Sequence, residues 1–276
     1  MTEREKPREN DTSGIVFDIR RGVTKDGPGL RTSVFLKGCP LRCAWCHNPE
    51  SQSPEIERAV TTGEVCGRSM AVSEVMAEVR RDAVFYAQSG GGVTITGGEP
   101  LAQPAFSLAI AAAALREGID VAIDTSGFAP WRVFEKLLAA QAEAAALRDL
   151  AREPGIMFLY DLKCIDGAKH RKLTGVDNGA ILANLQRLDA AGARTWIRCP
   201  LVPGINDSPD DLAALEAFAA GLGNVEKTEI CPYHPLGLEK YAKFGKTPPL
   251  DRRESPSPET VAGWKKALAG IPSLAK

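Results

Sequence analysis

Short β-rich runs that alternate with helical patterns are the feature that most restricts the fold of this chain. After the first interval they recur about every thirty residues. The six runs are Ser33–Lys37, Val93–Thr96, Val121–Ile123, Ile156–Tyr160, Thr195–Arg198 and Thr228–Ile230. Strands that alternate with helices favour βαβ units and a parallel sheet. Six such units predict an α/β fold of the incomplete (β/α)6 TIM-barrel type.

The helical segments between these runs carry recognisable start and stop signals. A helical period from Val72 to Val79 lies before Gly90, and Gln103-Pro104 opens a second helix that stops at Gly118. Ser208-Pro209-Asp210-Asp211 combines a capping hydroxyl, an N-terminal proline and first-turn acids, so it predicts a helix start. The alanine-rich stretch from Lys136 to Ala151 predicts a long helix.

Length and composition predict a single catalytic domain. The chain has 276 residues and a net charge of −1, which suits one core and gives no electrostatic footprint for nucleic acid or an anionic membrane. We expect a polar N-terminal segment (1–13), a barrel (14–245), and a Pro-rich segment with a C-terminal helix (246–276). No signal peptide or membrane span is visible, so a cytoplasmic location is expected.

Three closely spaced thiols mark a candidate metal site. Cys39, Cys43 and Cys46 are three of seven cysteines, an odd number that disfavours a disulfide framework. Electron-carrying cubane clusters normally have four thiolates, so three suggest an iron left open for a small molecule. The alternatives are a structural zinc site that also uses His47, and an electron-transfer cluster with a fourth cysteine from elsewhere.

Polar motifs follow the other predicted strands and should meet the cysteine loop. In α/β barrels, functional groups collect at the C-terminal ends of the strands. The motifs in order are Gly97-Gly98-Glu99-Pro100, Asp124-Thr125-Ser126-Gly127, Asp161-Leu162-Lys163, Arg198-Cys199-Pro200 and Pro232-Tyr233-His234. One barrel mouth is therefore expected to receive thiolates, glycines, carboxylates, a lysine, an arginine and a histidine.

With these motifs in place, the chain resembles the radical S-adenosylmethionine (SAM) enzymes. Their hallmark is Cys-x3-Cys-x-aromatic-Cys, in which Trp45 is the aromatic residue here. More narrowly the chain is similar to the activating enzymes of glycyl radical enzymes, relatives of the pyruvate formate-lyase activase. The resemblance covers roughly 14–245. Further matching segments are Asp26–Arg31, Lys37–Pro40, Cys46–Glu50, Ser89–Thr94, Trp196–Arg198 and Pro232–Gly237.

The resemblance implies a role for each matching residue. Cys39, Cys43 and Cys46 are implied to hold one [4Fe–4S] cluster whose free iron chelates SAM. The implied SAM-binding residues are Trp45, Cys46, His47, Gly97, Gly98, Glu99, Asp124, Thr125, Asp161, Leu162, Lys163 and His234. Lys163, Arg198 and His234 are the implied catalytic residues. Asp124, Thr125 and Asp161 also match a monovalent-cation site of the pyruvate formate-lyase relative.

The implied activity is reductive cleavage of SAM to a 5′-deoxyadenosyl radical that abstracts a hydrogen from a glycine of a partner enzyme. The segment Asp26–Arg31 is a candidate for shaping the entrance for that glycine. The alternatives are a radical SAM enzyme that acts on a small molecule or on another macromolecule, and a non-catalytic zinc or electron-transfer protein.

The chain departs from its larger relatives after Cys46. Those activases continue into a ferredoxin-like insert with eight more cysteines, whereas only Cys66 occurs here between Cys46 and Gly97. We therefore expect a single cluster that an external flavodoxin or ferredoxin reduces directly.

Overall fold

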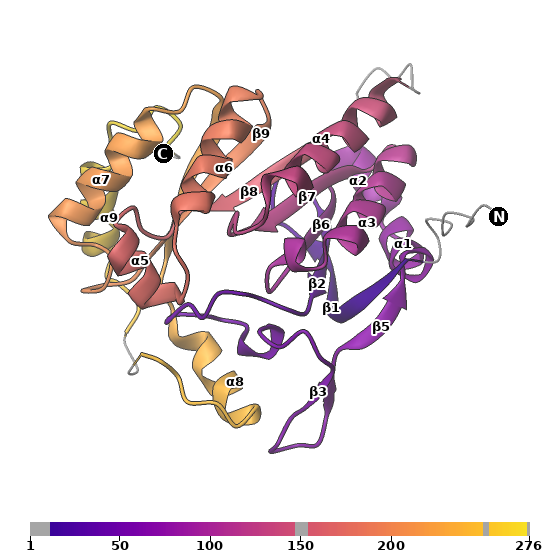
Figure 1. Cartoon of the computed structure of the whole chain (residues 1–276), viewed down its shortest axis with the longest axis horizontal. Helices are drawn as coiled ribbons and strands as arrows, with labels where there is room; N and C mark the ends of the chain where they lie inside the picture. The colour runs from indigo at the N-terminus through magenta and orange to yellow at the C-terminus, as the bar shows by residue number, and fades with distance from the viewer. Residues whose placement is uncertain (1–11, 147–153, 251–253, 275–276) are drawn as a thin grey trace, which may run out of the picture.

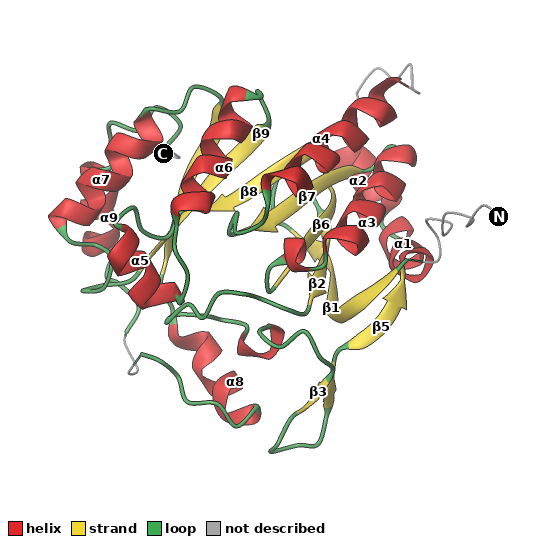
Figure 2. Cartoon of the chain, viewed as in Figure 1, coloured by secondary structure: helices red, strands yellow, loops and turns green. Residues whose placement is uncertain are grey.

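One eight-stranded sheet forms the centre of the protein (Figures 1 and 2). The computed structural model describes residues 12–146, 154–250 and 254–274. Six neighbouring strands pair in parallel and follow one another in chain order. They are β2 (Arg31–Leu36), β6 (Gly92–Gly97), β7 (Asp120–Thr125), β8 (Ile156–Asp161), β9 (Arg194–Leu201) and β10 (Val225–Pro232). All six strand predictions are confirmed.

Two antiparallel strands that the sequence analysis missed extend the sheet beyond β2. β1 (Ser13–Val23) pairs with β2, and β5 (Arg68–Ala71) pairs with β1. A separate small hairpin consists of β3 (Glu57–Arg58) and β4 (Val65–Cys66). Among the described residues β10 and β5 form opposite edges of the sheet, and no pairing closes the barrel. The structure thus confirms the predicted incomplete barrel.

Most of the described helices lie between the parallel strands in sequence and cover the sheet, and two follow the last strand (Figure 2). They are α1 (Val72–Arg80), α2 (Ala83–Ser89), α3 (Pro104–Arg116), α4 (Trp131–Ala146), α5 (Gly167–Thr174), α6 (Gly179–Ala190), α7 (Pro209–Ala220), α8 (Leu238–Lys243) and α9 (Pro258–Ala267). The predicted start of α7 is confirmed, because Ser208 Oγ accepts a hydrogen bond from the Asp211 amide. The predicted helix 136–151 begins earlier, at Trp131, and its last residues lie outside the described part.

The helical pattern that starts at Val72 forms two helices instead of one. The break falls at Asp82, whose carboxylate accepts hydrogen bonds from Arg21 and Thr32. Gly90 then ends α2 in the left-handed conformation, at φ 71°, where glycine carries no Cβ penalty. The sequence therefore predicted the end of this region correctly and missed the break within it.

The main hydrophobic core lies between the sheet and its helices. Apolar side chains of the parallel strands and of α1, α3, α4, α6 and α7 form it. A second, small cluster consists of Ala122, Met157 and Leu159, with Trp196 packed against it. In α9 and the turn after it, Trp264, Leu268 and Ile271 are buried in the main core. The expected C-terminal helix therefore packs on the barrel, and no described helix is long and apolar enough to cross a membrane.

Candidate active site

A cavity of about 470 Å³ lies at the C-terminal ends of the parallel strands, a size typical of small-ligand sites. Most of the residues predicted for the site line it. They are Cys39, Cys43, Trp45, Cys46, His47, Gly97, Gly98, Asp124, Thr125, Asp161, Lys163, Arg198 and His234. The structure thus brings the strand-end motifs and the cysteine loop together. Glu99 and Leu162 are the predicted site residues that do not line the cavity.

The cysteine loop is held in place by its backbone. After β2, the Gly38 amide donates to the carbonyl of Ser51 at 2.7 Å, and the Cys39 amide to that of Gln52 at 3.2 Å. Further along, the Arg42 amide donates to the Thr174 carbonyl at the end of α5 at 2.7 Å. Figure 1 shows this loop running from β2 towards α5 and back past α8. Both halves of the loop are therefore fixed against other parts of the fold, with the thiols towards the cavity.

Burial keeps the three thiols of the loop protonated in the absence of a bound metal. Burial raises the pKa of Cys39 and of Cys43 to about 12, and burial also raises the pKa of Cys46. These thiols need a bound metal to become thiolates, because thiolate is the ligand form. In the described part of the chain, no three His, Cys, Asp or Glu side chains converge on one ion position. The three cysteines line one cavity and can each bind a different iron of a cubane.

The Gly-Gly-Glu motif supports the cysteine loop and the loop after β7. A Cβ atom on Gly98 would lie 2.4 Å from the Gly38 carbonyl oxygen, so only glycine allows this close approach. The Glu99 side chain is fully buried behind the cavity wall. Its carboxylate accepts hydrogen bonds from Leu101 N, Thr125 Oγ1, Ser126 N and Ser126 Oγ, at 2.6 to 3.0 Å. The structure therefore gives Glu99 a role in holding the loop at Thr125 and Ser126.

Charged side chains from three strands form a network on one cavity wall. Arg198 donates from Nη2 to Asp124 and from Nε to Asp161, the latter at 3.2 Å. Lys163 Nζ donates to the second oxygen of Asp161 at 2.6 Å. Burial alone would lower the pKa of Lys163, but the Asp161 carboxylate holds it above its ordinary value. Lysine and arginine therefore stay charged here and could bind a carboxylate.

Two stacked imidazoles form another part of the cavity lining. The rings of His47 and His234 lie 3.9 Å apart, and His47 Nε2 is 3.0 Å from the His234 carbonyl oxygen. Burial, and then the neighbouring His234, lower the pKa of His47. His234 Nδ1 and the Tyr233 hydroxyl are buried atoms without a hydrogen-bond partner. Buried polar atoms are normally paired, so these two fit a polar ligand in the cavity.

The structure adds cavity residues to the predicted set. They include Lys25, Asp26, Asn48, Ser51, Ser126, Cys231 and Tyr233. In the sequence, Asp26 belonged to the segment 26–31 that was predicted to shape the entrance. Ser126 and Tyr233 belonged to the predicted strand-end motifs. Asp26 accepts a hydrogen bond from Ser33 Oγ at 2.7 Å, and Thr94 Oγ1 donates to its carbonyl oxygen at 2.7 Å. Asp26 precedes β2 and does not follow a strand end, where the site residues were expected. Its place in the cavity is therefore visible only in the folded structure.

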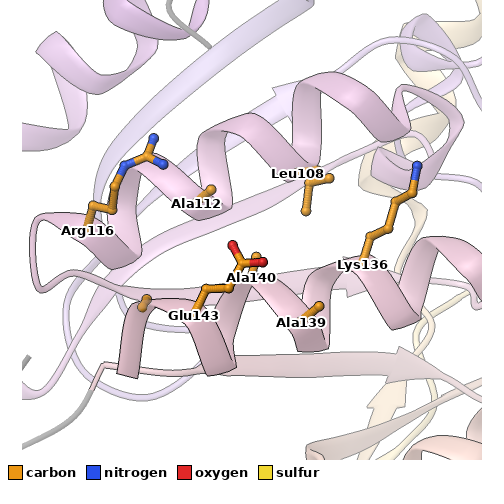
Figure 3. Close-up of a pocket in the computed structure, with 8 residues that line it drawn as sticks. Leu108, Ala112, Arg116, Lys136, Ala139, Ala140 and Glu143 are labelled. Carbon is orange, nitrogen blue, oxygen red and sulfur yellow. The ribbon is translucent and has the colours of Figure 1, made fainter. Parts of the chain in front are cut away.

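A second hollow of about 270 Å³ lies between α3 and α4 (Figure 3). Alanines form much of its lining, and Figure 3 shows Arg116, Lys136 and Glu143 projecting around it. None of the predicted site residues lines this hollow. The candidate active site is therefore the cavity at the strand ends.

Comparison with known proteins gives matches over most of the chain. A profile of the radical SAM superfamily matches residues 33–215. The chain is 37% identical to an isethionate sulfite-lyase activating enzyme of Nitratidesulfovibrio vulgaris, with 88% of this chain and 91% of that protein covered. It is 34% identical to a benzylsuccinate synthase activating enzyme of Thauera aromatica, over 84% of this chain and 82% of that protein.

A solved structure shares the fold. A domain of the pyruvate-formate lyase-activating enzyme from Bacteroides vulgatus is similar at a TM-score of 0.53 and 27% identity. The similarity covers 68% of this chain and 98% of that domain.

The curated relatives are longer in one or more internal segments. The alignment to the Nitratidesulfovibrio vulgaris protein is 295 positions long but contains 88% of this 276-residue chain. About 243 residues of this chain are thus aligned, and about 52 of the 295 positions have no counterpart here. This shortfall fits the missing insert that the sequence analysis inferred between Cys46 and Gly97.

Proposed function

Because the chain belongs to the radical SAM superfamily, and within it to the activating enzymes of glycyl radical enzymes, we propose that the cavity at the strand ends is its SAM site. The chemistry that a [4Fe–4S] cluster and SAM supply when bound is reductive cleavage to a 5′-deoxyadenosyl radical, which abstracts a hydrogen from a glycine of a partner enzyme. The protein contributes the positions of its ligands and the exclusion of water.

Cys39, Cys43 and Cys46 hold the single cluster in this proposal. The observation that carries it is that all three thiols line one cavity together with two buried polar atoms that lack partners. His234 Nδ1 and the Tyr233 hydroxyl would each gain a hydrogen bond to SAM. Because the chain belongs to a family of radical SAM enzymes, we do not propose the structural zinc site or the electron-transfer cluster as its function.

In this proposal, the charged network determines how SAM is oriented in the cavity. Lys163 lines the cavity with the three thiols, and its ammonium group lowers the pKa of Cys43 against the effect of burial. We assign Lys163 to the SAM carboxylate and the backbone at Gly97 and Gly98 to the methionyl ammonium group. Arg198 holds Asp161 and Asp124 in place, and His47 and Trp45 flank the adenosyl part.

The monovalent cation is the finer part of the cofactor proposal. Each oxygen of Asp124 and Asp161 already accepts a hydrogen bond from Thr96, Lys163 or Arg198. We propose that a cation binds at these carboxylates only together with the SAM carboxylate, which adds a ligand that the protein alone lacks. Rates of SAM cleavage in potassium and in tetramethylammonium buffers test this, and equal rates would count against the ion.

A glycine loop of the partner would enter beside Asp26. Asp26 lines the cavity, and the turn 26–31 is anchored by Arg31, which donates to the carbonyl oxygens of Pro28 and Val93. The named partners of the relatives include isethionate sulfite-lyase and benzylsuccinate synthase. We propose isethionate sulfite-lyase as the first candidate, because two activating enzymes of that name are 37% and 36% identical to this chain.

An external flavodoxin or ferredoxin is the proposed electron donor. Between Cys46 and Gly97 the chain has one cysteine, Cys66, so this segment cannot build a second cluster. The barrel (14–245) would thus carry the only redox centre, with 1–13 and 246–276 outside it.

Anaerobic reconstitution tests the proposed function. We expect about four irons per chain, the content of one cubane, a visible spectrum that bleaches on reduction, and release of 5′-deoxyadenosine from SAM. Eight or more irons would contradict the single-cluster proposal. A colourless protein that binds one zinc ion and leaves SAM intact would contradict the function itself.

A further inference from the structure

The C-terminal strap, residues 233–246, fastens onto the back of the cysteine loop. Tyr241 donates from its hydroxyl to the Cys46 carbonyl at 3.3 Å, and Lys246 Nζ donates to the Pro49 carbonyl at 2.5 Å. A Cβ atom on Gly237 would lie 2.7 Å from the Cα atom of His47. The strap thus packs as closely as backbone allows against the segment that directly follows the last cluster cysteine.

An ion pair at the centre of this contact contains a buried carboxylate. Lys240 Nζ donates to Glu50 Oε1 at 2.6 Å and to Asn48 Oδ1 at 2.9 Å. Glu50 is 7% exposed, and its other oxygen, Oε2, is buried without a hydrogen-bond partner. Among the described residues, Lys240 is the cation in direct contact with this carboxylate, and Lys243 attracts it without a direct contact.

The carboxylate is electrostatically close to the cluster site. Lys240 bridges Glu50 and Asn48, which lies two residues after Cys46, and the neighbouring Tyr241 donates to the Cys46 carbonyl. Charges act over longer distances in a desolvated interior than in water. The reduction potential of an iron–sulfur cluster depends on net charge and on solvent exposure around it. A buried negative charge opposes the added electron, whereas its lysine partner offsets that effect.

We propose that the Lys240–Glu50 pair is a positioning element that sets the reduction potential of the cluster. This inference rests on the proposed function, because it requires a cluster at Cys39, Cys43 and Cys46. Lys240 and Glu50 touch neither cluster nor SAM, and act through the charge that they place behind Cys46. A purely structural role would be to hold the strap, and it predicts an effect on stability without a directed change in potential.

Redox titration of the reconstituted protein, followed by electron paramagnetic resonance, tests the proposal. K240M should make the cluster harder to reduce by about tenfold in the equilibrium constant, which is about 59 mV for one electron. E50Q should shift the potential in the opposite direction, and the double variant should return close to wild type. K240R, which keeps the charge, should match wild type.

A matched control lies three residues further along α8. Lys243 pairs with Glu64, whose side chain is 66% exposed, and it attracts Glu50 without a direct contact, so K243M should shift the potential clearly less than K240M does. Equal potentials in wild type, K240M and E50Q would overturn the inference, as would shifts of the same sign in K240M and E50Q. If K240M takes up no cluster, E50Q and K240R decide between these results. A wild-type chain without iron would instead overturn the proposed function and this inference together.

Discussion

Replacing Glu99 by glutamine separates two roles that the sequence could not distinguish. The structure places Glu99 behind the cavity wall with four accepted hydrogen bonds, two on each carboxylate oxygen. Glutamine keeps one oxygen and presents an NH2 group to the donors on the other side. In either orientation of the amide we therefore expect two of the four charge-assisted hydrogen bonds to be lost, at least one of them from the loop at Thr125 and Ser126, while the protein keeps its fold.

The magnitude follows from the number of bonds lost. A hydrogen bond to a charged group contributes about 1.5–3 kcal/mol, so two of them amount to about 3–6 kcal/mol. Burial raises the pKa of Glu99, because a buried carboxylate is costly to ionise. The neutral amide of glutamine avoids this cost, which offsets about half of the free energy lost with the hydrogen bonds. A net loss of about 1.5–3 kcal/mol lowers Tm by about 3–12 °C in a domain of this size class.

Differential scanning calorimetry and SAM-binding titrations measure the two effects. E99Q should lower Tm by the amount above, together with weaker SAM binding because the cavity wall moves. Glu117 is the control: its carboxylate pairs with Arg80 on the surface, and E117Q should shift stability by less than about 1 kcal/mol. Weaker SAM binding in E99Q with an unchanged Tm would refute the positioning role and restore the direct contact that the sequence predicted.

Three further outcomes follow from other parts of the structure. C43A should lose the cluster and SAM cleavage, whereas C66A should keep both, as iron content and 5′-deoxyadenosine release would show. E57Q should destabilise the protein by about 3 kcal/mol in urea unfolding, because Lys37 is 0% exposed and pairs with Glu57 at 2.6 Å; a shift below about 0.5 kcal/mol would contradict this. Burial lowers the pKa of His170 below 6.5, so the unfolded chain binds that proton more readily and stability should fall as pH drops below 6.5; H170Q should reduce this slope.

Four of the parallel strands, β2, β6, β7 and β8, were predictable because they are buried on both faces along most of their length. β2, β6 and β8 are short runs of apolar or small residues that are buried along most of their length, and such runs give a strong signal. β1 was missed because charged residues interrupt its second half, where Asp18 is half-buried and Arg20 and Arg21 are exposed. β5 is a four-residue edge strand, too short for a periodic pattern.

The sequence predicted which residues belong to the site better than it predicted which of them contact each other. Strand-end motifs placed Asp161, Lys163 and Arg198 at one mouth, and the structure joins them by hydrogen bonds. The role of Glu99 was not predictable, because its partner Ser126 lies 27 positions away and their contact depends on how two loops pack. The contact between the strap and the cysteine loop could not be predicted either, because Lys240 and Glu50 are separated by 190 positions in the sequence.

The central claim is that the cavity generates a radical that reaches a glycine of a partner enzyme. We would incubate the reconstituted protein anaerobically with SAM, a reductant and isethionate sulfite-lyase, and follow electron paramagnetic resonance together with 5′-deoxyadenosine. The same mixture with the partner's radical-site glycine replaced by alanine is the control. The account predicts a SAM-dependent glycyl radical, formed with about one 5′-deoxyadenosine per radical and absent from the control. Release of 5′-deoxyadenosine without a glycyl radical in this or any other glycyl radical enzyme tested would contradict it.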